Sequence, residues 1–108
     1  MLVQGVLVFC LPSRVDVSNT RDLVQPVRQA IQEGQRKIAL DFTGTQSVDS
    51  TALGALVQVF KMLRSEGGDL MLCCVSDAVH RVFSITRLDQ VFTLCSSRED
   101  AIARLSKS

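Results

Sequence analysis

The sequence predicts an α/β domain built on a mostly parallel sheet of four or five strands with about four helices. Short apolar runs alternate along the chain with longer segments in which apolar residues recur at helical spacing. Several of the longer segments begin after Ser, Asn or Asp and end at glycine, which favour helix starts and ends. The 108 residues, 46% of them apolar, can bury one core, so we expect a single domain over residues 1–108.

The first half of the chain alternates between strand-like and helix-like segments. Its expected elements are a strand at residues 5–11, a helix from Asn19 or Thr20 to about residue 33, a strand at 37–42 and a helix at 50–66. Glycines follow both helices and are expected to end them.

The second half repeats this alternation. Its expected elements are a strand at residues 69–75, a helix at 77–85 capped by Ser76 or Asp77, a strand at 90–94 and a terminal helix capped by Ser96 or Ser97. Successive parallel strands connected through helices should cross over with right-handed geometry.

The segment Val48-Asp49-Ser50-Thr51 places a hydroxyl at the start of a strongly apolar helix. Ser50 is a suitable N-cap, because its oxygen can accept a hydrogen bond from a free N–H of the first turn. The same N–H groups would stabilise a phosphate attached there. The pattern alone is consistent with a plain cap or with a modification site.

The helix from Ser50 carries two apolar stripes, one more than packing on a sheet requires. The second stripe consists of Ala52, Ala55, Val59 and Met62. A neighbouring helix could cover this stripe, or it could form a surface for binding another protein.

Composition excludes several classes of partner. Lys and Arg number 12 against 11 Asp and Glu, so the net charge of +1 does not favour nucleic acid binding. No apolar run approaches the roughly 18 residues that span a bilayer, and the N-terminus lacks a basic signal region. We therefore expect a cytoplasmic protein without direct membrane insertion.

Motifs for catalysis, cofactors and metals do not occur in the sequence. It has no phosphate loop, no dinucleotide-binding glycine pattern and no nucleophile elbow, so we expect neither an enzyme nor a bound cofactor. His80 has no ligand partner at zinc-site spacing, which predicts no metal site. Within apolar runs, Cys10, Cys73, Cys74 and Cys95 are expected to be free packing residues, with the adjacent pair pointing to opposite faces of a strand.

The chain resembles the STAS domain family, which includes the bacterial anti-sigma factor antagonists. The resemblance rests on I-A-L-D-F-T-G at residues 38–44, V-D-S-T-A-L-G at 48–54, G-G-D-L at 67–70, V-H-R-V-F-S-I-T-R-L at 79–88 and V-F at 91–92. In that family an anti-sigma factor that is also a serine kinase phosphorylates the serine after the aspartate, the position of Ser50. The resemblance thus implies a GHKL-type kinase partner, a phosphatase, and a contact surface comprising Asp49, Ser50, Thr51, Ala52, Ala55, Val59 and Met62.

The sequence departs from the family pattern in ways that carry structural expectations. Ala52, Ser13, Asp77 and Arg87 replace residues that are common in the family. Arg87 should cost about 1–2 kcal/mol if it adopts a left-handed conformation. Few residues precede the first strand, so we expect an exposed sheet edge near residues 6–9 and weak homodimerisation through it.

Two functions follow from the resemblance. One is a regulator that frees the sigma factor by binding its anti-sigma kinase and that is released from the kinase when Ser50 is phosphorylated. The other is an accessory subunit of a membrane transporter of the lipid-asymmetry ABC type, which docks on the ATPase without a phosphoswitch. The intact Asp49-Ser50 pair favours the first.

Overall fold

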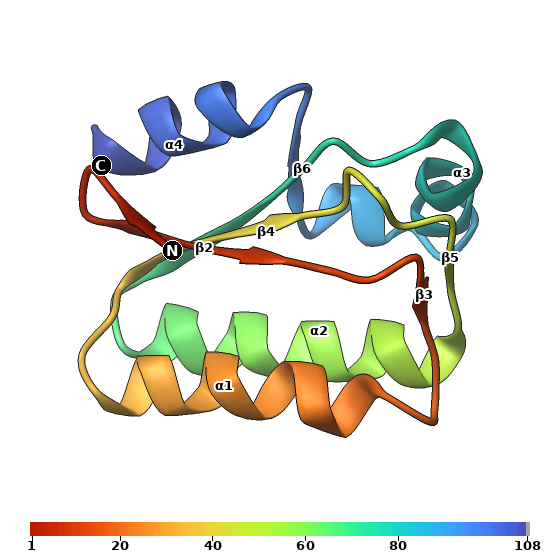
Figure 1. Cartoon of the computed structure of the whole chain (residues 1–108), viewed down its shortest axis with the longest axis horizontal. Coiled ribbons are helices and arrows are strands. Elements are labelled where there is room, and N and C mark those ends of the chain that lie inside the picture. Colours follow the sequence, from red (N-terminus) through yellow and green to blue (C-terminus); the bar gives the residue numbers. More distant parts are fainter. Residues whose placement is uncertain (108) are drawn as a thin grey trace.

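Five strands form the main sheet of the computed structural model, which describes residues 1–107 (Figure 1). In spatial order they are β1 (Leu2–Val3), β2 (Val6–Cys10), β4 (Lys37–Asp41), β6 (Asp69–Cys73) and β7 (Thr93–Cys95). Only β1 runs antiparallel to its neighbour, and the other pairs are parallel. Two shorter strands, β3 (Arg14–Val15) and β5 (Ser47–Val48), pair with each other at one end of the molecule.

The helices cover both faces of this sheet. Figure 1 shows α1 (Thr20–Gln32) and α2 (Ser50–Ser65) side by side on one face and α4 (Arg98–Ser106) on the other. A third helix, α3 (Asp77–Ile85), packs near β5 and leads into a 3₁₀ turn, η1 (Leu88–Gln90). The predicted α/β fold with a mostly parallel sheet is thereby confirmed. No helix within residues 1–107 has the length and apolar character needed to cross a membrane.

Alternating side chains of the central strands divide the core into two layers. In β4, Ile38 and Leu40 join the layer beneath α1 and α2, whereas Ala39 joins the layer beneath α4. This follows from the two-residue period of a strand, which sends successive side chains to opposite faces. Burial on both faces explains why the three middle residues of β4, at 38–40, are all apolar.

The N-terminus forms a hairpin where the sequence analysis expected an open edge. Gln4 and Gly5 have φ angles of 53° and 80°, the left-handed pair that a tight hairpin turn requires. They return the chain so that β1 pairs with the start of β2, and Val8 N donates to Met1 O at 2.7 Å. The prediction of an exposed sheet edge near residues 6–9 is therefore wrong for most of this segment.

The segment expected as a strand at residues 90–94 begins later. Residues 88–90 form η1, and Phe92 N donates to Leu88 O at 2.9 Å. Phe92 is buried against the rings of Phe60 and Phe83, so its apolar character serves packing in a turn. Of residues 88–95, only Thr93–Cys95 pair with β6.

Candidate functional site

Asp49, and not Ser50, caps the start of α2. Its extended backbone, with φ −102° and ψ 178°, places Oδ1 2.9 Å from the N–H of Ala52, which donates to it. Ser50 becomes the first helical residue, and its side chain is exposed. The predicted cap at Ser50 is wrong because the preceding carboxylate takes the same role, as Asp does readily.

The Asp49 carboxylate also connects α2 to the loop that precedes α1. Its Oδ2 accepts a hydrogen bond from Val17 N at 3.0 Å, and Asp49 N donates to Val15 O at 3.1 Å. Within that loop, hydrogen bonds from Ser18 hold the pKa of Asp16 below its usual value. The start of α2 and the approach to α1 therefore form one hydrogen-bonded unit.

The outer surface of α2 near Ser50 carries little side-chain bulk. Ser50, Thr51, Gly54 and Gln58 are all exposed. Gly54 lies one turn after Ser50, and a Cβ atom added there would have no atom within 4 Å. Sequence reasoning missed Gly54 as part of this surface, although its spacing of four residues from Ser50 could have indicated it.

The second apolar stripe of α2 is mostly covered by α1. Ala52 and Val59 are each 1% exposed, while Ala55 and Met62 are half-buried. The expectation that all four form a partner surface is therefore wrong for Ala52 and Val59, because α1 packs against this side of α2. Of the predicted contact residues, Asp49, Ser50, Thr51, Ala55 and Met62 retain at least partial exposure.

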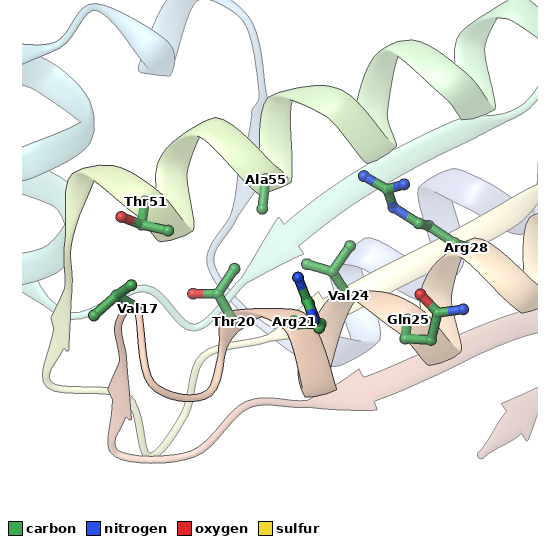
Figure 2. Close-up of a pocket in the computed structure, with 8 residues that line it drawn as sticks. All are labelled: Val17, Thr20, Arg21, Val24, Gln25, Arg28, Thr51 and Ala55. Carbon is green, nitrogen blue, oxygen red and sulfur yellow. The ribbon is translucent and has the colours of Figure 1, made fainter.

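A groove of about 460 Å³ runs between α1 and α2, and its lining includes Thr51, the residue after Ser50 (Figure 2). Thr51 and Ala55 line it from α2, and Arg21 and Arg28 line it from α1. Arg28 Nη2 donates to Gln58 Oε1 at 3.0 Å, which bridges the two helices. Sequence reasoning missed the arginines, whose seven-residue spacing indicates a shared side of α1.

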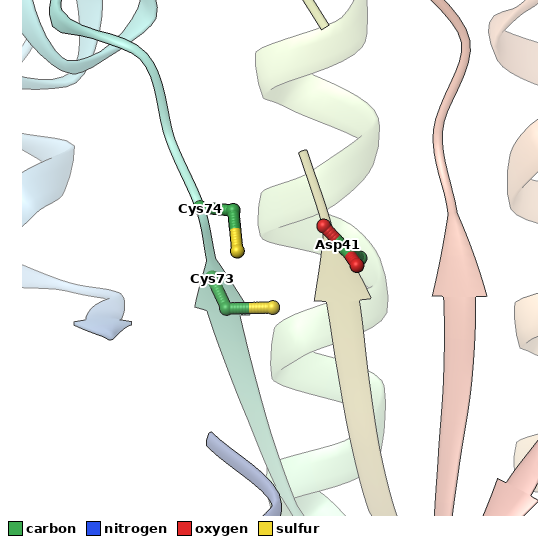
Figure 3. A group of neighbouring side chains, drawn as sticks. All are labelled: Asp41, Cys73 and Cys74. Atoms are coloured by element: carbon green, nitrogen blue, oxygen red, sulfur yellow. The ribbon is translucent and has the colours of Figure 1, made fainter. Parts of the chain in front are cut away.

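A second cluster, Asp41, Cys73 and Cys74, lies at the carboxyl ends of β4 and β6 (Figure 3). One ligand atom from each lies within 4.8 Å of the others. The expectation that the two thiols point to opposite faces is wrong, because β6 ends at Cys73 and Cys74 adopts a left-handed φ of 61°.

This cluster is a poor candidate for a metal centre. Asp41 is already paired with Arg98, whose Nη2 lies 2.6 Å from Asp41 Oδ2. Burial raises the pKa of the Cys73 thiol to about 12, and the nearby Asp41 charge acts in the same direction. Because the Arg98 guanidinium already occupies the Asp41 carboxylate, the geometry favours a structural role for this cluster.

Comparison with known proteins agrees with this architecture. The chain matches the family model described as the STAS domain over residues 2–101. It is 31% identical over 101 residues to BtrV of Bordetella bronchiseptica, provisionally named an anti-sigma factor antagonist, with 94% of this chain and 87% of BtrV covered. It is 29% identical over 104 residues to the anti-sigma F factor antagonist of Paenibacillus polymyxa, covering 94% and 88%.

A solved structure shows the same fold. The crystal structure of a protein from Thermotoga maritima, provisionally named an anti-sigma factor antagonist, superimposes with a TM-score of 0.90 at 26% identity. The match covers 97% of this chain and 91% of that protein.

Proposed function

The chain belongs to the STAS domain family, and we propose that it is an anti-sigma factor antagonist switched by phosphorylation of Ser50. In this proposal the unphosphorylated protein binds an anti-sigma factor that is also a GHKL-type serine kinase. Phosphorylation releases the kinase, which can then sequester its sigma factor again. The names of the relatives from Bordetella and Paenibacillus support the antagonist role.

The observation that carries the proposal is that Asp49 caps α2 while, among the described residues, the Ser50 hydroxyl stays free. Asp49 caps α2, so the fold does not need the Ser50 hydroxyl. Within the described residues Ser50 Oγ makes no hydrogen bond, and its side chain is exposed at the first position of a 16-residue helix. The hydroxyl is therefore accessible to a kinase at no structural cost.

The chemistry is a phosphoryl transfer from ATP. Ser50 Oγ attacks the γ-phosphorus, the bond to the β–γ bridging oxygen breaks, and ADP leaves while the hydroxyl proton passes to a base of the kinase. The product carries roughly 1.5–2 negative charges, which the positive end of α2 tolerates. We therefore expect the fold to survive phosphorylation.

The complex with the anti-sigma kinase should dissociate when Ser50 is phosphorylated. A partner packed over Ser50 and the bare surface at Gly54 would have to desolvate the phosphate close to the Asp49 carboxylate. Burying an unpaired charge costs several kcal/mol, which lowers affinity by orders of magnitude. Charge repulsion between the phosphate and Asp49 adds to this cost inside a dry interface.

The test is to incubate the protein with its cognate kinase and ATP and to map the phosphorylated residue by mass spectrometry. Ser50→Ala should bind the kinase constitutively and change stability by under about 0.5 kcal/mol, because Asp49 keeps the cap. Ser50→Asp should fold and bind poorly. Thr51→Ala is the matched control and should remain a substrate.

Label on Thr51 would contradict the assignment to Ser50. Absence of both binding and label would favour the second reading, an accessory subunit that docks on a transporter ATPase without a phosphoswitch.

A further inference from the structure

The groove between α1 and α2 is cationic along its length. Arg21 and Arg28 lie seven residues apart, a rise of about 10 Å along the helix axis. Neither forms an ion pair within residues 1–107, and no carboxylate belongs to the residues that line the groove. Among the described residues, the Arg28 side chain has one hydrogen bond, which goes to the neutral amide of Gln58. Both positive charges are thus available to a ligand.

Apolar side chains lie beside these charges. Val24 lines the groove and is 9% exposed, whereas Val17 stands at its mouth and is 74% exposed (Figure 2). Val17 is held in place because its N–H donates to Asp49. A groove with an exposed valine at one end and two arginines along one side is a surface that a partly acidic, partly apolar protein segment would cover.

We propose that this groove receives an acidic segment of the anti-sigma kinase, a proposal that rests on the function given above. Two carboxylates spaced by about 10 Å match the arginines, which corresponds to three residues of extended chain or two turns of helix. A segment with two carboxylates can pair with each arginine separately, whereas a single phosphate offers one anionic centre. The length of the groove therefore favours a peptide over a small anion.

This placement links docking to the switch. Thr51 lines the groove and directly follows Ser50, so an acidic segment in the groove lies near the site of phosphorylation. A phosphate on Ser50 would repel the carboxylates that Arg21 attracts. Phosphorylation then weakens the docking contact as well as the contact over Ser50.

The experiment measures the affinity of the full chain for its cognate kinase at two salt concentrations. Arg21→Glu combined with Arg28→Glu should weaken binding by roughly tenfold or more and reduce its salt dependence. Arg81→Glu is the matched control, since Arg81 is exposed on α3 and makes no ion pair within the described chain, and it should bind normally. Thermal melts verify that the variants fold. Reversal of the acidic residues in the kinase segment should restore binding to the double variant.

Two results would overturn the proposal while leaving the proposed function intact. One is a double variant that binds within twofold of the wild type and is still phosphorylated on Ser50. The other is a rise in the melting temperature of the free chain with inorganic phosphate or ATP that disappears in the double variant, which would identify a small-anion site. Failure of the wild-type chain to bind the kinase at all would reject both proposals.

Discussion

Asp49 illustrates at the residue scale how one carboxylate positions a functional surface. Its two oxygens accept from different segments, Ala52 N in α2 and Val17 N in the loop before α1. The aspartate of the Asp-Ser pair therefore has a structural reason to precede the serine, independent of any effect on phosphorylation. This arrangement also fixes the mouth of the groove.

Replacing Asp49 should separate its two roles. Asp49→Ala removes both acceptors and is expected to lower the free energy of unfolding by about 1–2 kcal/mol. Asp49→Asn keeps a cap oxygen and should lower the free energy of unfolding by a smaller amount. Urea unfolding at neutral pH measures both values, and equal losses in the two variants would contradict the two-acceptor account.

The ion pair between buried Asp41 and partly exposed Arg98 should make stability depend on acid pH. Burial of Asp41, which is 3% exposed, opposes its ionisation, but hydrogen bonds from Thr43 and pairing with Arg98 outweigh burial and hold its pKa below 3.8. The stabilisation is therefore present above the ordinary pKa and is lost as pH falls through the lowered one. Asp41→Asn should reduce the loss of unfolding free energy as the pH falls through this range. The same loss in the variant and the wild type would contradict the prediction.

Removing Arg98 tests the same pair at neutral pH. Arg98→Ala leaves the buried Asp41 carboxylate with hydrogen bonds from Thr43 but without its cation, and should lower stability by clearly more than the loss of an exposed ion pair does. Arg104→Ala is the control, because Arg104 forms an exposed pair with Asp100 in the same helix and should cost under about 0.5 kcal/mol. Similar losses of stability in both variants would show that the buried Asp41 carboxylate does not need Arg98 as its ion-pair partner.

Among the elements, α2 is the one whose apolar surface exceeds what the sheet alone can cover, and α1 buries the excess. Val59→Lys should destabilise the protein strongly, by several kcal/mol, because a buried lysine must lose its hydration. Met62→Lys should cost clearly less, since Met62 is half-buried, and Gln32→Lys, at the exposed last residue of α1, is the control. Thermal melts rank the three variants, and an order that differs from burial would contradict the packing of α1 on α2.

The turn between α3 and η1 stores backbone strain at Arg87. Arg87 adopts the left-handed conformation for which the sequence analysis expects a cost, with φ 63° and ψ 17°. Arg87→Gly removes the clash of the Cβ atom and should raise stability by about 1 kcal/mol. Thr86→Gly, at a φ of −85°, is the control and should lower stability. Lower stability in both variants would mean that the Arg87 side chain stabilises the turn.

For the molecule as a whole, all four cysteines gather at the carboxyl edge of the parallel sheet, but at different depths. Cys10 is exposed, Cys74 is half-buried, and Cys73 and Cys95 are buried. Burial raises the pKa of both buried thiols. A thiol reagent should therefore modify Cys10 first, Cys74 more slowly and the buried pair only on unfolding. Denaturation of fresh protein without reductant should give four thiols, and a total of two would reveal a disulfide.

Local signals in the sequence determined most of the individual elements. Ser76 and Ser97 cap α3 and α4 through side-chain oxygens, as their positions predicted. Gly34 follows α1 with a φ of 104°, a conformation that glycine adopts without strain. The five residues of β4 likewise show burial on both sides in their composition. These features depend on neighbouring residues and on the periods of helix and strand, so the sequence by itself contains them.

Tertiary structure decided the features that join distant segments. The hairpin strand β1 and the pair β3 and β5 are two residues each, too short to leave a periodic pattern. The bond from Val17 to Asp49 spans 32 positions, and the burial of Val59 depends on where α1 packs. Composition cannot tell which stripe of an apolar helix a neighbour will cover, because burial depends on the three-dimensional contacts of the whole chain. The cationic groove beside Ser50 exists only because those contacts bring α1 and α2 together.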